Sequence, residues 1–196
     1  MRRIRPLLWS LSLTVLLVAC GGEESTDTTA SSSASAESEP LPGKVRDVEA
    51  KPVPDLTLET MEGGSIDLAD QEGRVLLVNF WAPWCAPCRE EIPDLNALQA
   101  ELGDDGLRVI GIALDRQGRE KVEPFAEKLS IEYPIVIDAE GTAESEFGPI
   151  PGLPTTIVVG PDGQITKRVV GIFPVDEMTP TLKEMLNAGE PPSDAT

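Results

Sequence analysis

Three observations predict an α/β fold, in which a central sheet carries helices on both faces. First, near-continuous apolar runs at 74–80 (RVLLVNF) and 107–114 (LRVIGIAL) are typical of strands buried on both sides. Second, a helical stretch follows each of these runs, and strands that alternate with helices are the pattern of α/β sheets. Third, strand-like segments at 155–160 and 164–170 flank the turn residues PDG, and an amphipathic helical stretch follows at about 175–188.

The remaining elements fit between these anchors. PDLTLET and SIDLAD, separated by GG, predict a short N-terminal β-hairpin over about 54–70. The helix after the first buried strand runs to about Leu102, where GD and DG provide stop signals. A helix over 119–130, a strand over 133–138 and a short helix over 143–147 then precede the closing hairpin.

Composition limits the possible functions. The chain has 196 residues and is 40% hydrophobic, so one domain can bury a real core without disulfides. Lysine and arginine total 16 against 34 aspartates and glutamates, for a formal net charge of −18. This balance excludes a nucleic-acid partner, because phosphates require a basic face. It also opposes non-specific approach to anionic lipid headgroups.

The N-terminus predicts a signal peptide over 1–19. Three arginines within the first five residues precede an apolar run of about 13 residues, shorter than the ~20 that span a bilayer as a helix. The sequence LVAC at 17–20 resembles the lipobox of bacterial lipoproteins, which implies that Cys20 becomes the first mature residue and carries a lipid. The alternative is an uncleaved N-terminal anchor. Both place the domain outside the cytoplasm and tie it to a membrane.

The segment that follows predicts a disordered tether over 20–50. It is rich in Ser, Thr, Glu and Ala and has almost nothing to bury, although serine runs of this kind also occur in glycosylated stalks. About 30 flexible residues reach roughly 30 Å, so the domain stays near the membrane without a fixed orientation. The folded domain is then expected over 51–188, with a disordered tail over 189–196.

A cysteine pair, Cys85 and Cys88, follows the first buried strand in a chain without histidine. Structural zinc requires four Cys or His ligands, haem attachment requires a histidine where Arg89 stands, and a copper site would also be expected to use histidine. A static disulfide in so short a loop constrains little of the unfolded chain. The pair therefore predicts thiol–disulfide chemistry, with no metal and no cofactor.

The position of the pair suits this chemistry. Cys85 falls at the N-terminus of the next helix, where unpaired N–H groups and the helix dipole stabilise the attacking thiolate. Cys88 lies one turn further in, less exposed, and close enough to attack a mixed disulfide on Cys85. Pro87 occupies the first turn, where its missing N–H is tolerated.

An acid lies on the buried face of the same helix. One helical stripe, with spacings of three and four residues, contains Cys88, Glu91, Leu95, Leu98 and Leu102. Burial would raise the pKa of Glu91 and make it a proton acceptor for Cys88. The alternative is that Glu91 is a solvated charge like its neighbour Glu90.

Two motifs together resemble a known family. FWAPWCAPCREEIP at 80–93, with GLPTT at 152–156, resembles the thioredoxin fold and more specifically the membrane-tethered TlpA/ResA-type thiol–disulfide oxidoreductases. The similarity runs over about 51–188. It includes the N-terminal hairpin and a helix–strand insertion at 118–138 that plain thioredoxins lack, around a central mixed sheet.

This resemblance implies roles for individual residues. Cys85 would be the nucleophile, Cys88 the resolving thiol and Glu91 the active-site acid. Pro154 would be a cis-proline that faces the disulfide and turns the backbone of Leu153 toward a client. Further client contacts are expected from Trp84, Ala86, Pro87 and Thr155.

Two neighbouring positions bear on these roles. Trp81 and Trp84 are both candidates for the rim of the site, although packing in the core would explain Trp81 equally well. Asn79 stands where thioredoxins carry a buried Asp, and because an amide takes no proton, more of the acid–base work should fall on Glu91.

By resemblance, we expect a monomeric, lipid-anchored enzyme that exchanges disulfides with client proteins as a reductase. Electrons would come from a membrane thiol donor, for cytochrome c maturation or similar thiol maintenance. Ala-Pro between the cysteines is nearer to the Gly-Pro of reducing thioredoxins than to the Pro-His of the oxidant DsbA. The alternatives are a lipoprotein binding module with a static disulfide and a peroxiredoxin-like peroxidase, whose usual cysteine loop PWCAPC does not match.

Overall fold

The structure, a computed structural model, describes residues 42–189. The predicted signal peptide, Cys20 and most of the predicted tether lie outside the described residues, as does the tail from residue 190. Between residues 42 and 189, no helix is long and apolar enough to cross a membrane.

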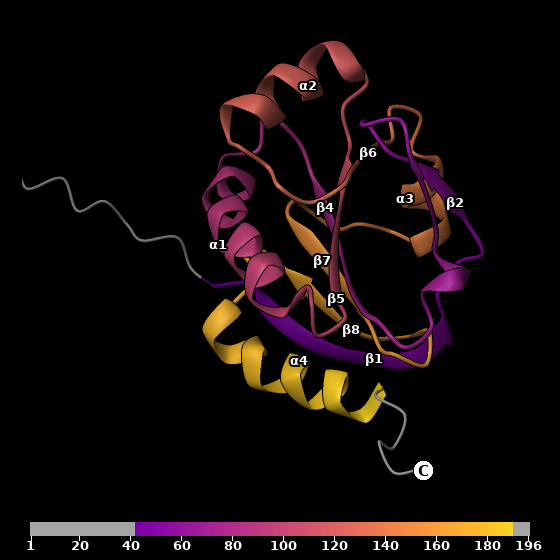
Figure 1. The fold of residues 1–196 in the computed structure, drawn as a ribbon. Coiled ribbons are helices and arrows are strands. Elements are labelled where there is room, and N and C mark those ends of the chain that lie inside the picture. Colours follow the sequence, from indigo (N-terminus) through magenta and orange to yellow (C-terminus); the bar gives the residue numbers. More distant parts are fainter. Residues whose placement is uncertain (1–41, 190–196) are drawn as a thin grey trace, which may run out of the picture. The chain divides into compact units, whose positions relative to one another are not determined.

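The domain is organised around a mixed sheet, as the sequence predicts (Figure 1). Strands β4, β5 and β6 run parallel to one another, whereas β7, β8 and β1 extend the sheet by antiparallel pairing. In spatial order the strands are β1 (Lys44–Pro52), β8 (Gln164–Val170), β7 (Thr155–Val159), β4 (Val75–Trp81), β5 (Leu107–Ala113) and β6 (Ile135–Ile137).

Helices cover both faces of this sheet, which confirms the predicted fold class. In Figure 1, α1 and α4 lie together on one side, and α3 lies with the β2–β3 hairpin on the other. The elements outside the main sheet are β2 (Thr57–Glu59), β3 (Ser65–Asp67), a 3-10 turn (Ala69–Gln71), α1 (Ala86–Leu102), α2 (Arg119–Lys128), α3 (Thr142–Phe147) and α4 (Val175–Gly189).

The residues of β4 show why the central strands read as continuous apolar runs. Successive side chains of a strand point to opposite faces. Val75 and Leu77 pack under α1 and α4, whereas Leu76, Val78 and Phe80 pack under α3 and the hairpin. All seven residues of β4 are buried because both faces are covered.

The predicted boundary between the tether and the folded domain is wrong. The tether was expected to extend to residue 50, but β1 already begins at Lys44 and pairs antiparallel with β8. β1 is an edge strand with mostly exposed side chains, and only Val45 and Val48 pack against the core. The charged residues of β1 resemble the composition of the predicted tether. In the structure, one of them, Asp47, forms an ion pair with Lys167 on β8.

The topology brings three connections to one end of the sheet. β4 ends at Trp81 and leads into the cysteine pair. β7 runs antiparallel to β4 and begins with Thr155 opposite Phe80, so Pro154 lies at this same end. β8 ends with Val170 opposite Thr155, and the segment after it carries Phe173. The functional site is built from these three connections.

Candidate active site

The cysteine pair forms a disulfide at the start of α1. Cys85 is the N-cap residue of this helix, and its Sγ accepts a hydrogen bond from the backbone N–H of Cys88 at 3.2 Å. Cys88 is fully buried, whereas 5% of Cys85 remains exposed. Cys85 is therefore the more accessible residue of the pair.

The first turn of α1 favours a thiolate at Cys85. The leading N–H groups of a helix have no intrahelical partners, and together with the helix dipole they stabilise negative charge on a neighbouring sulfur. Pro87 lies in this turn without disrupting it, because the N–H that proline lacks would be unpaired there.

The exposed rim of the site contains Trp84. This side chain is 69% exposed, and it is the one large hydrophobic side chain exposed in the described part of the chain. Ala86 and Pro87 beside it are also exposed. Trp81, by contrast, is fully buried and packs against Phe125 with the ring centroids 5.8 Å apart. Of the two tryptophans, Trp84 forms the rim and Trp81 belongs to the core.

The loop before β7 also packs against the apolar cluster of the cysteine pair. The Leu153–Pro154 peptide bond is cis, and the partly buried Leu153 packs against the apolar cluster that includes both cysteines. Thr155 is buried, and its hydroxyl donates a hydrogen bond to the carbonyl of Gly152 at 2.7 Å. The Thr155 side chain therefore holds this loop together instead of facing a client.

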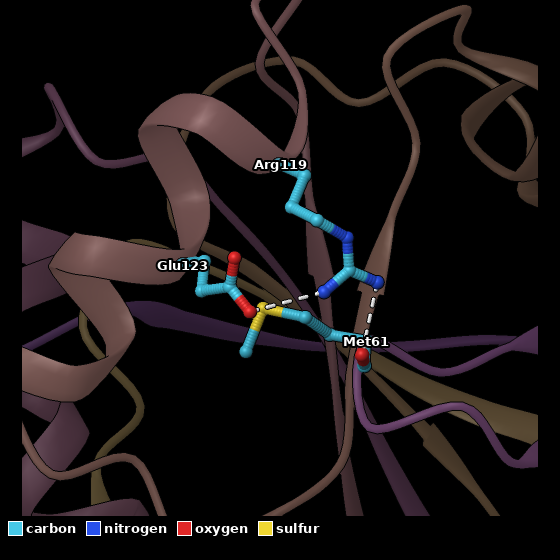
Figure 2. Close-up of polar contacts among 3 residues, drawn as sticks. All are labelled: Met61, Arg119 and Glu123. Carbon is cyan, nitrogen blue, oxygen red and sulfur yellow. Dashed lines mark hydrogen bonds and ion pairs between the residues drawn. The ribbon is translucent and has the colours of Figure 1, made fainter.

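Polar contacts at α2 hold the hairpin close to this cluster (Figure 2). Arg119 donates to the backbone carbonyl of Met61 at 2.9 Å and pairs with Glu123 at 3.2 Å. Met61 and Phe125 both pack against the cluster that contains Cys85. The predicted helix–strand insertion thus contributes to the surroundings of the disulfide.

Glu91 lies inside the protein, one helical turn after Cys88. Its side chain is fully buried and accepts two hydrogen bonds. The side-chain amide of Asn79 donates to Oε1 at 2.8 Å, and the backbone N–H of Phe173 donates to Oε2 at 2.9 Å. The predicted stripe of α1 is therefore the buried face, and the solvated alternative for Glu91 is excluded.

Burial raises the pKa of Glu91 from 4.5 to about 7. The hydrogen bonds from Phe173 and Asn79 lower this pKa in part, and the charge of Asp94 raises it slightly. An acid with a pKa near neutrality is present in both protonation states at physiological pH, as a general acid–base group requires.

The structure adds residues that sequence reasoning did not find. Asn79 also donates to the hydroxyl of Thr156 at 3.1 Å, and both side chains are fully buried. Gly111, opposite Asn79 on β5, lets Trp81 and Tyr133 approach closely, because a Cβ there would lie 3.0 Å from each of them. Thr156 could have been found from the sequence, because it is the second threonine of the GLPTT motif. The contribution of Phe173 could not, because it comes from a backbone N–H and does not depend on the side chain.

The described residues offer no ready metal site. Over 42–189, no three His, Cys, Asp or Glu side chains group in a way that could hold an ion.

Comparisons with known proteins agree with this geometry. The AhpC/TSA family matches residues 50–168. The thiol-disulfide oxidoreductase ResA of Geobacillus thermodenitrificans is 30% identical over 132 residues, which cover 67% of this chain and 75% of that protein. The thioredoxin-like protein YneN of Bacillus subtilis is 33% identical over 132 residues, with 66% and 76% covered.

Solved structures extend the comparison to the fold. The thiol:disulfide interchange protein of the thioredoxin family from Chlorobium tepidum is 29% identical and superimposes with a TM-score of 0.63 over 72% of this chain and 99% of that one. The mixed sheet and the disulfide at the start of α1 are therefore those of a thioredoxin-like enzyme. This chain belongs to the AhpC/TSA family and is a thiol-disulfide oxidoreductase of the ResA type with a thioredoxin fold.

Proposed function

We propose that this oxidoreductase works outside the cytoplasm as a reductase of client disulfides and is tied to the cell membrane by a lipid on Cys20. One observation carries the catalytic part of the proposal. The disulfide exposes only Cys85, beside the exposed Trp84, and a buried acid follows Cys88 by one turn. The signal-peptide pattern and the LVAC sequence support the location.

The reaction is a pair of thiol–disulfide exchanges. The Cys85 thiolate attacks one sulfur of a client disulfide, forming a mixed disulfide and releasing the other client sulfur as a thiolate. The Glu91 carboxylate then takes the proton of the Cys88 thiol, and Cys88 attacks Cys85. The second client thiolate leaves, and the Cys85–Cys88 disulfide forms. A membrane thiol donor returns two electrons to the pair.

The surroundings of the sulfurs support the reducing direction. DsbA is a strong oxidant because its reduced form is stabilised. Here the chain has no histidine that could stabilise a thiolate, and the buried Glu91 follows Cys88 by one helical turn. A carboxylate one turn after Cys88 disfavours a thiolate at Cys88, so it opposes the stabilisation of the reduced pair that the helix N-terminus provides at Cys85.

A client polypeptide would lie between two edges of the site. Trp84, Ala86 and Pro87 line one edge, and the backbone of Leu153 before the cis-proline lines the other. By family resemblance, apocytochrome c thiols are the first clients to test, with general thiol maintenance as the wider role.

Labelling in whole cells tests location and direction together. A membrane-impermeant maleimide, applied to cells with a permeable outer layer, should label Cys85 without prior reduction, because a reductase is kept reduced. A Cys85→Ser variant is the control for site specificity, and Cys20→Ala should move the protein out of the membrane fraction.

The other outcomes are equally informative. Labelling only after lysis would place the protein in the cytoplasm and contradict the location. Labelling only after treatment with a reductant would contradict the reductase role and favour a static disulfide or an oxidant. Turnover of peroxide by the purified protein would favour the peroxidase alternative.

A further inference from the structure

The side-chain amide of Asn79 is only partly satisfied in the structure. Its nitrogen donates both hydrogens, one to Glu91 Oε1 at 2.8 Å and one to Thr156 Oγ1 at 3.1 Å. Its carbonyl oxygen is buried and has no hydrogen-bond partner among the described residues. An unpaired buried acceptor costs free energy. We therefore expect this amide orientation in only one protonation state of Glu91.

The observed orientation fits a Glu91 carboxylate. Both Glu91 oxygens accept, Oε1 from the Asn79 amide and Oε2 from the backbone N–H of Phe173. A protonated acid differs, because one oxygen then carries a hydrogen that needs an acceptor. The N–H of Phe173 can only donate, so Oε2 must remain an acceptor. The proton therefore belongs on Oε1, where it would meet the donor nitrogen of Asn79.

Turning the amide over removes this conflict. Amide oxygen and nitrogen are nearly equal in size, so a half-turn about the last side-chain bond exchanges them with little displacement. Asn79 Oδ1 would then accept from Glu91 Oε1–H. The hydroxyl of Thr156 can donate as well as accept, so it would donate to the same Oδ1. The oxygen that has no partner in the carboxylate state gains two in the acid state, while Nδ2 moves to the buried position in which no described residue pairs with Oδ1.

We propose that Asn79 is a positioning residue that turns over as Glu91 gains and loses its proton, donating to the carboxylate and accepting from the acid. The inference rests on the proposed role of Glu91 as proton acceptor for Cys88. It gives a physical reason for an amide at this position of β4: an amide serves both protonation states of its neighbour, whereas a carboxylate would compete for the same proton.

Among the titratable groups around Asn79, Glu91 is the one whose protonation the amide follows. α1 contributes Cys88 and Asp94, and the segment before β6 contributes the buried Tyr133. Burial first, and the charge of Glu91 second, raise the pKa of Tyr133, so its hydroxyl stays neutral. The segment between β8 and α4 contributes a backbone N–H, that of Phe173.

Nuclear magnetic resonance of the oxidised full-length protein tests the turnover directly. With 15N-labelled asparagine and 13C-labelled glutamate, the spectra can be followed from about pH 5 to pH 9. Cys85 and Cys88 do not titrate as a disulfide, and the chain has no histidine to obscure this range. The Asn79 amide signals should change with the midpoint of the Glu91 carboxyl signal. Below that midpoint their Overhauser contact with Thr156 should weaken.

The variant Glu91→Gln tests the same point without a titration. A glutamine has a donor nitrogen and an acceptor oxygen, so it mimics the protonated acid. Its Nε2 should face Asn79 and hold the amide in the turned-over orientation at every pH. If the Asn79 amide keeps its contact with Thr156 in this variant, the proposal is overturned.

A third arm separates this proposal from the acid–base role itself. Asn79→Leu removes the donor to the carboxylate and the acceptor for the acid together, so it should shift the Glu91 midpoint by less than about one pH unit, and the exposed control Asn187→Leu should leave it unchanged. A rise of about one pH unit or more in Asn79→Leu would show that Asn79 stabilises the carboxylate alone, and it would contradict the proposal. If the Glu91 carboxyl signal does not titrate in the wild-type protein, the acid–base role fails, and the Glu91→Gln spectrum still decides whether the amide turns over.

Discussion

Replacement of Cys85 by serine should abolish disulfide exchange, with a loss of about 1,000-fold or more in the rate of client reduction. Cys85 lies at the N-terminus of α1 with 5% of its surface exposed, whereas Cys88 is fully buried. A serine hydroxyl at this position does not ionise near neutral pH and cannot attack a client disulfide. The rate is measured with reduced protein and an oxidised protein client.

Cys88→Ser should behave differently. The proposed nucleophile Cys85 remains, but no second sulfur is left to resolve the mixed disulfide, so the variant should accumulate as a covalent complex with its client. Non-reducing electrophoresis detects this complex, and a reductant should release it. If Cys85→Ser traps client instead, or if both variants keep their activity, the roles assigned to the two cysteines are wrong.

Replacement of Glu91 by glutamine should slow the enzyme and make it more stable at alkaline pH. Loss of the proposed proton acceptor for Cys88 should reduce the rate of mixed-disulfide resolution by about 100-fold or more. Single-turnover kinetics, with the mixed disulfide formed first, measure this step by itself. Glu90→Gln is the matched control, because Glu90 is exposed on the same helix turn.

The stability effect follows from the raised pKa of Glu91. The folded protein holds the Glu91 proton up to a pKa of about 7, whereas an ordinary glutamate releases it near 4.5. The folded state therefore binds more protons in this range, so its stability is complete below about pH 4.5 and falls as the pH rises to about 7. The loss amounts to about 3 kcal/mol.

Glu91→Gln should remove this loss, since glutamine does not ionise. Urea unfolding at pH 5 and pH 8 should show the variant more stable than wild type by about 2–3 kcal/mol at pH 8 and little different at pH 5. Equal pH dependence in wild type and variant would show that Glu91 does not carry the buried, titrating proton.

The parts of the fold that the sequence predicted are those with a local signature. β4 and β5 are buried on both faces, so their apolar runs stand out from the rest of the chain. The turn residues PDG marked the β7–β8 hairpin in the same way. β1 was missed because an edge strand exposes most of its side chains, and the pairing of β1 with β8 depends on residues more than a hundred positions away.

In the active site too, local sequence patterns were predictive and contacts between distant residues were not. The helical spacing of Cys88 and Glu91 is a local pattern, and it correctly predicts that the acid lies on the buried face of α1. The hydrogen bond from Phe173 joins residues 82 positions apart through a backbone N–H, which carries no side-chain signal. Trp81 was ambiguous because a tryptophan suits a rim and a core equally, and only its packing against Phe125 decides between them.

The reduction potential of the Cys85–Cys88 couple tests the central claim most directly. Equilibration of the purified protein with glutathione or dithiothreitol buffers, followed by quenching and separation of the two forms, gives the value. A dedicated reductase predicts a potential below about −230 mV, toward the ~−270 mV of thioredoxin. A potential near the ~−120 mV of DsbA would contradict the reductase assignment and make the protein an oxidant of its clients.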